Sequence, residues 1–118
     1  MTDGATTVLS KLETVLDMDA ESILRQSLQS FIATKMMQVQ QRISQLYLDH
    51  QRFTQKYEMS LEAFQQALDV LEEQSEEEAT IRGVSLLEAV ADSRWWAHVQ
   101  EELATETSRL VQLQALEQ

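Results

Sequence analysis

The sequence is poor in the residues that shape turns and cross-links: its 118 residues include no Cys, no Pro and only two Gly. A chain of average composition and this length would contain about six Pro and about eight Gly. Folds built from many short strands need such residues at their turns. We therefore exclude a β-sandwich, barrel or meander and expect an all-α fold. The absence of Cys also excludes disulfides, iron–sulfur clusters and thiol nucleophiles.

Positive charge is also scarce, since nine Lys and Arg stand against twenty Asp and Glu, for a formal net charge of −11. Most of such a surface repels phosphate, so the net charge disfavours nucleic acid as a partner. The sequence has no run of roughly twenty apolar residues that would span a bilayer. Its start has neither the basic leader nor the apolar core of a signal peptide. We expect a cytoplasmic protein that does not bind membranes.

The negative charge is concentrated in the second half of the chain. Residues 20–57 carry five basic and two acidic side chains, whereas residues 58–118 carry fourteen acidic side chains and three Arg. This asymmetry indicates that the two segments pack against each other or that the acidic one meets a basic partner.

A long helix is predicted over residues 19–57, which contain no Gly and have apolar residues at alternating steps of three and four. Asp19 can cap its start by accepting a hydrogen bond from the first turn. The seam consists of Ile32, Met36, Val39, Ile43, Leu46, His50, Phe53 and Tyr57. Because a helix of this length needs cover, we expect it to form a hairpin with the C-terminal helix and to dimerise through its remaining apolar surface.

Shorter elements are predicted on either side of the long helix, within a single helical domain over residues 1–118. Ser60 can cap one helix, Ser85 and Glu88 form a capping box for the next, and Asp92 offers a second cap after it. Gly83 can adopt the left-handed conformation that ends a loop. The predicted segments are a short helix at 7–17, a short helix at 60–73, an acidic loop at 74–84 and C-terminal helices at 85–116.

The sequence carries no recognisable catalytic, cofactor or metal motif. Its two histidines, His50 and His98, are far apart, and neither has an acidic residue three positions before it or lies in an H-E-x-x-H context. There is no glycine-rich phosphate loop and no nucleophile elbow. We interpret His50 as a polar seam residue that sets register or pairs with a partner, and we expect a protein that is not an enzyme.

Two features are candidates for binding another protein. The run EEQSEEE at 72–78 is either a solvated loop or a surface that steers a basic protein such as a ribonuclease. Trp95 and Trp96 are adjacent and so point about 100° apart on a helix. One of them can enter the core while the other lies at its edge as an interface anchor, although core packing alone would also explain the pair. The partner-binding candidates are Glu72, Glu73, Glu76, Glu77, Glu78, Trp95 and Trp96.

The segment KYEMSLEAF at 56–64 resembles the K-Y-G-M-S-x-E-E-F segment of small helical antitoxin-like proteins of archaea and cyanobacteria. In those proteins it joins a long helix to a short one, and an acidic linker and an aromatic-rich helix start follow. Here residues 72–78 and Trp95/Trp96 stand at the corresponding places, while Glu58 replaces the usual Gly. The resemblance implies a non-enzymatic protein whose acidic, Trp-bearing arm covers the site of a small basic toxin.

Two other functions remain open at this point. A dimeric coiled-coil structural or adaptor protein would use the same seam without a toxin partner. A nucleic-acid binder would use a basic stripe on the long helix, but these residues are spread around the helix and their local net charge is small. The stripe would consist of Arg25, Lys35, Arg42, Arg52 and Lys56.

Overall fold

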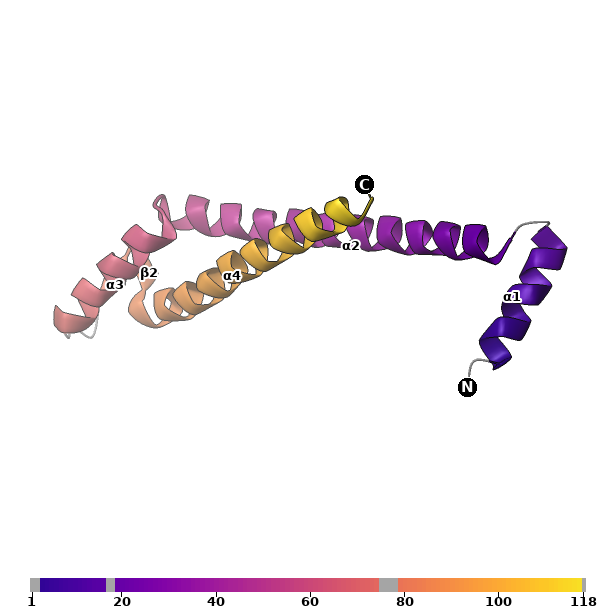
Figure 1. Ribbon diagram of the computed structural model, residues 1–118. Coiled ribbons are helices and arrows are strands. Elements are labelled where there is room, and N and C mark those ends of the chain that lie inside the picture. The colour runs from indigo at the N-terminus through magenta and orange to yellow at the C-terminus, as the bar shows by residue number, and fades with distance from the viewer. Residues whose placement is uncertain (1–2, 17–18, 75–78, 118) are drawn as a thin grey trace. The chain divides into compact units, whose positions relative to one another are not determined.

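The computed structural model describes residues 3–16, 19–74 and 79–117, and these residues are mostly helical. The elements are α1 (Asp3–Leu16), α2 (Ala20–Tyr57), α3 (Leu61–Gln74), β1 (Thr80–Ile81), β2 (Val84–Ser85) and α4 (Leu86–Glu117) (Figure 1). The contacts divide the chain into two compact units, residues 39–110 and residues 1–38 with 111–118, which are described separately. None of the described helices is long and apolar enough to cross a membrane.

The long helix α2 is capped at both ends by its neighbours in sequence. At the start, the backbone N–H of Ser22 donates to Oδ1 of Asp19 over 2.7 Å. That bond holds the pKa of the Asp19 carboxyl below its usual value. At the end, Glu58 has a φ of 55°, and its N–H donates to the carbonyl oxygen of Thr54 over 2.8 Å. Glu58 is therefore the left-handed residue that closes the helix.

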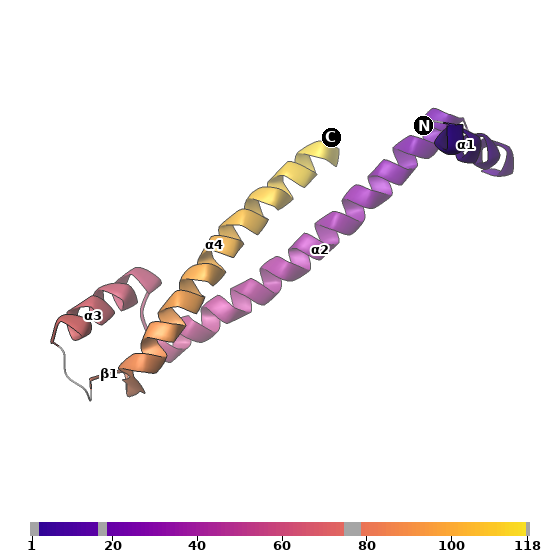
Figure 2. The ribbon, with the colours of Figure 1, turned by 90° about the horizontal axis from the view of Figure 1, so that it is seen from below.

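Within residues 39–110, α2 and α4 form the hairpin that the sequence predicts (Figure 2). Contacts between the two helices join residues 42 and 102, 50 and 96, and 56 and 92, so the helices are antiparallel. Within this unit the seam of α2 faces inward: Val39, Leu46, Phe53 and Tyr57 are buried, and Ile43 and His50 are half-buried. The two seam residues that belong to the other unit, Ile32 and Met36, are buried and half-buried respectively.

An aromatic cluster forms the core at the closed end of this hairpin. Trp96 of α4 is completely buried, and its ring stacks on Phe53 with centroids 5.6 Å apart. Tyr57 stacks on Phe64 of α3 with centroids 4.1 Å apart. Leu61, Leu68, Ile81 and Ala89 complete the cluster. Through these contacts α3, the strand β1 and α4 are all held against the end of α2.

A short β-hairpin, which was not predicted from the sequence, lies at the end of the predicted acidic loop and extends one residue beyond it. Ile81 pairs with Val84, and Thr80 with Ser85, in antiparallel register. The turn between them has positive φ at both central residues, 52° at Arg82 and 79° at Gly83, as a two-residue type I′ turn requires. The left-handed conformation predicted for Gly83 is thus present. Residues 75–78 lie outside the described residues.

The prediction of several C-terminal helices is wrong, because α4 is one continuous helix. Ser85 caps it, since its Oγ accepts from the N–H of Glu88 over 3.3 Å. Asp92, predicted as a second cap, lies inside the helix, where its carboxylate accepts from the hydroxyl of Tyr57 over 2.5 Å. Asp92 therefore does not begin a helix, and its side chain binds α2 instead.

The other unit contains α1, the first half of α2 and the last residues of α4. In α1, Leu9 and Leu12 are half-buried, while Val8 and Val15 are exposed. In α2, Ile23 and Ile32 are buried, although most of the neighbouring positions are exposed. The apolar surface of this part of α2 is therefore only partly covered.

Candidate partner-binding surface

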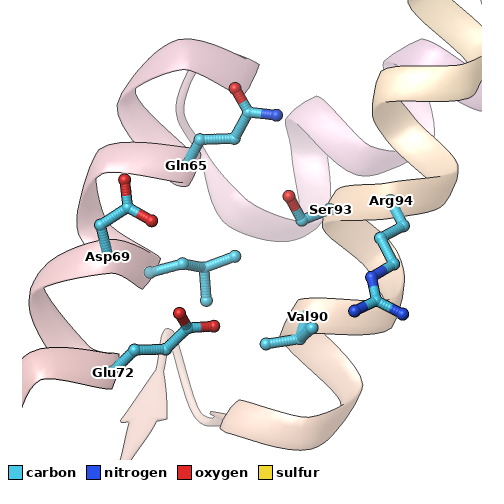
Figure 3. A pocket seen from close by; sticks show the side chains of 7 residues that line it. Gln65, Asp69, Glu72, Val90, Ser93 and Arg94 are labelled. Carbon is cyan, nitrogen blue, oxygen red and sulfur yellow. The ribbon is translucent and has the colours of Figure 1, made fainter.

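A groove of about 340 Å³ runs between α3 and the first turns of α4 (Figure 3). Its apolar lining comes from Leu68, which is nearly buried, and Val90, which is half-buried. The remaining lining residues are Gln65, Asp69 and Glu72 on α3 and Ser93 and Arg94 on α4. The groove thus combines an apolar lining with two carboxylates on one wall and one guanidinium on the other.

The charged side chains of α3, which forms one wall of this groove, are all acidic. The helix carries four acidic residues and no basic one, and all four are exposed: Glu62, Asp69, Glu72 and Glu73. Acidic groups at the C-terminal end of a helix oppose its dipole. The exposed acidic side chains at this end therefore add nothing to the stability of α3, and they are free to act on an approaching charge.

The two tryptophans have different environments. Trp96 is completely buried, whereas 55% of Trp95 is exposed. Trp95 lies beside His98, with ring centroids 5.6 Å apart, and two turns after Leu87, 84% of which is exposed. In this fold Trp96 offers no surface to a partner, whereas the exposed part of Trp95 could contact one.

His50 pairs with a residue of its own chain. The indole N–H of Trp96 donates to Nδ1 of His50 over 2.9 Å. An acceptor nitrogen has no proton, so the imidazole that makes this bond is neutral and carries its proton on Nε2. The polar seam position predicted from the sequence therefore provides the acceptor for the buried indole.

A second polar network joins the end of α2 to α4. Asp92 accepts from the hydroxyl of Tyr57 and from Nζ of Lys56, at 2.5 and 2.7 Å, and Glu88 lies 3.6 Å from the same Nζ. The bond to Asp92 raises the pKa of Lys56. Burial, together with Asp92, raises the pKa of Tyr57 well above its usual value. Sequence spacing does not reveal this network, because its members are more than thirty residues apart.

A third contact lies further along the hairpin. Arg42 of α2 donates to Glu102 of α4 over 2.5 Å, and His98 lies 3.0 Å from the other carboxylate oxygen. Bonding to Arg42 lowers the pKa of Glu102. Arg42, one of the basic residues of α2, is thus already occupied by an acidic residue of α4.

The predicted binding residues are only partly brought together. Glu72 lines the groove from α3, and Glu73 is exposed on the same helix. Trp95 lies on α4 outside the groove lining, about 100° around the helix from Arg94. The other predicted acidic residues, Glu76, Glu77 and Glu78, lie outside the described residues. Asp69 completes the acidic wall; it was not predicted because it lies outside the EEQSEEE run. Across the described ranges, no group of three or more His, Asp or Glu side chains is placed to hold a metal ion.

A comparison of the chain with protein-family models, curated proteins and solved structures finds no match. The antitoxin resemblance therefore depends on the sequence motif alone.

Proposed function

We propose that this chain is a non-enzymatic protein-binding module, antitoxin-like, that captures a basic protein through the acidic face of α3 and the exposed Trp95 of α4. The observation that carries the proposal is the groove between these helices, which has Asp69 and Glu72 on one wall and an apolar lining. Occluding the site of a small toxin would be the biological result.

Charge favours a basic partner for this surface. α3 has acidic residues only, and residues 58–118 hold the excess of negative charge in the chain. The electrostatic field of this negative charge accelerates the approach of a basic protein and repels an acidic one. Because surface charges are screened by salt, we expect binding to weaken as ionic strength rises.

Trp95 supplies an apolar contact area, which the charged side chains alone do not provide. A half-exposed indole can bury a large apolar area on contact and is a frequent anchor in protein interfaces. Leu87, which is also exposed on α4, adds further apolar surface to this helix. A partner that seats basic side chains against Asp69 and Glu72 and an apolar patch against Trp95 would use both.

The proposal also includes a homodimer, in which the apolar surface of α2 left exposed in a single chain is covered by a second one. Exposed large apolar side chains in the first half of α2 support this part of the proposal.

The binding function is tested by co-expressing the chain with the product of the neighbouring gene and measuring complex formation by calorimetry. Asp69→Asn with Glu72→Gln, and separately Trp95→Ala, should each weaken the complex about tenfold or more. Glu117→Gln, which removes a charge at the far end of α4, should leave it unchanged. Equal affinity for all variants would refute the surface, and self-association into large species without a partner would favour an adaptor protein.

A further inference from the structure

A row of apolar side chains is exposed in the first half of α2. Leu24, Leu28 and Phe31 are 55%, 59% and 60% exposed. Their spacing of four and then three residues places them on one face of the helix. The row is a continuous apolar surface that belongs to residues 1–38 and is separate from the groove of α3 and α4.

Opposite charges stand at the two ends of this row. Glu21 lies three residues before Leu24, and Lys35 lies four residues after Phe31, on the same helix face. Both are exposed, and Glu21 also pairs with Arg25 over 2.8 Å on its own helix. Each lies seven residues from Leu28, so the row is acidic at one end, basic at the other and apolar between.

We propose that a second copy of this chain covers the row, with the two α2 helices antiparallel and related by a two-fold axis at Leu28. In this arrangement Glu21 of each copy faces Lys35 of the other, and the apolar residues meet between the two ion pairs. The same patch then serves both chains, as a two-fold dimer requires. This inference concerns the homodimer of the proposed function and is independent of the basic partner.

The charges select the antiparallel orientation. Parallel helices in register would place Glu21 against Glu21 and Lys35 against Lys35, which is unfavourable at both ends. The antiparallel pair replaces both repulsions by attractions without moving the apolar residues out of contact. The order of charges along one helix therefore determines how two copies meet.

The size of the row predicts how strong the dimer is. Three half-exposed side chains of this size bury roughly 400 Å² or less per chain, about half of the roughly 800 Å² per partner in a standard stable complex. We therefore expect a dimer that forms and dissociates with protein concentration rather than a permanent one.

The orientation is tested by disulfide cross-linking, for which the natural chain has no background because it lacks Cys. The full chain is prepared as Glu21→Cys, Lys35→Cys and Leu28→Cys. A disulfide needs Cα atoms within about 7 Å, whereas residues 21 and 35 of one helix are roughly 21 Å apart. An equal mixture of Glu21→Cys and Lys35→Cys should give roughly tenfold more cross-linked dimer than either variant alone.

Leu28→Cys, at the two-fold axis, should cross-link with itself. Efficient cross-linking of Glu21→Cys alone would indicate parallel helices and overturn the proposal. Failure of Leu28→Cys to cross-link at high protein concentration would show that the row is not the interface.

Charge reversal gives an independent readout by sedimentation. Lys35→Glu and Glu21→Lys should each raise the dimer dissociation constant, because each places like charges together, and the double variant should restore it. Leu28→Glu should weaken the dimer roughly 10- to 100-fold. Lys11→Glu, a matched charge reversal on α1, should have no effect. Loss of the dimer with intact capture of a basic protein would separate this inference from the binding function.

Discussion

Glu58 and Arg82 form an ion pair in which both residues have left-handed backbone. Nη1 of Arg82 lies 3.0 Å from Oε2 of Glu58. The φ angle is 52° at Arg82 and 55° at Glu58. They are the two non-glycine residues with positive φ in the described part of the chain. One closes α2, and the other begins the turn of the β-hairpin. The pair therefore links the end of α2 to the turn of the β-hairpin.

Glu58→Gly should give a more stable protein than Glu58→Ala, by about 1 kcal/mol in the free energy of unfolding. Both variants lose the exposed ion pair with Arg82, which contributes at most about 1 kcal/mol. Only Gly adopts the left-handed conformation without strain from Cβ. The comparison is made by urea denaturation. Equal stability of the two variants would contradict a backbone role for this position, where the resembling family has Gly.

A local sequence signal predicted the start of α2, because the cap of Asp19 involves a residue only three positions away. The seam of α2 could also be predicted from the sequence, since helical spacing alone decides which residues share a face. Asp92 was misread for the opposite reason. An Asp ahead of an apolar pattern resembles a cap, and its partners on α2 are more than thirty residues away.

The β-hairpin and the acidic wall were missed for different reasons. Arg82–Gly83 between β-branched residues is a recognisable two-residue turn, but the scarcity of Gly and Pro favoured a helical chain with irregular loops. Asp69 joins the groove only because α3 packs beside α4, which spacing within α3 does not reveal. The hydrogen bond between Trp96 and His50 likewise depends on tertiary packing, because the two residues are 46 positions apart.

Replacement of His50 by Leu should destabilise the fold by about 1–3 kcal/mol, because the buried indole N–H of Trp96 would lose its acceptor. Trp96→Phe removes the donor instead. The double variant should cost less than the sum of the two single variants, since neither unpaired group remains. Urea denaturation of the four proteins measures this coupling. Strict additivity would show that the hydrogen bond does not contribute to stability.

The protein should lose stability in alkaline solution above about pH 10. The folded-state pKa of Lys56 is raised by Asp92, so the stability from its protonated form is present below its unfolded pKa and is lost as pH rises through the folded one. The contribution of Tyr57 to stability changes with pH in the same direction, because burial raises its folded-state pKa and favours the neutral phenol. Denaturation between pH 8 and 11 measures the loss.

Tyr57→Phe removes one of the two groups and should flatten this alkaline loss. Lys11→Gln, which removes an exposed lysine of α1, should leave the profile unchanged. An identical decline in wild type and Tyr57→Phe would contradict the contribution of the tyrosine.

The neighbouring tryptophans should respond in opposite ways to truncation. Trp96→Ala removes a completely buried side chain and should cost about 3–5 kcal/mol in the free energy of unfolding. Trp95→Ala removes one that is more than half exposed and should change stability by no more than about 0.5 kcal/mol. Acrylamide quenching gives a second measure in folded protein: the fluorescence left in Trp96→Phe comes from Trp95 and should be quenched readily. The fluorescence left in Trp95→Ala should be protected. If Trp95→Ala unfolded the protein, its indole would belong to the core, and it could not serve as the anchor of a binding surface.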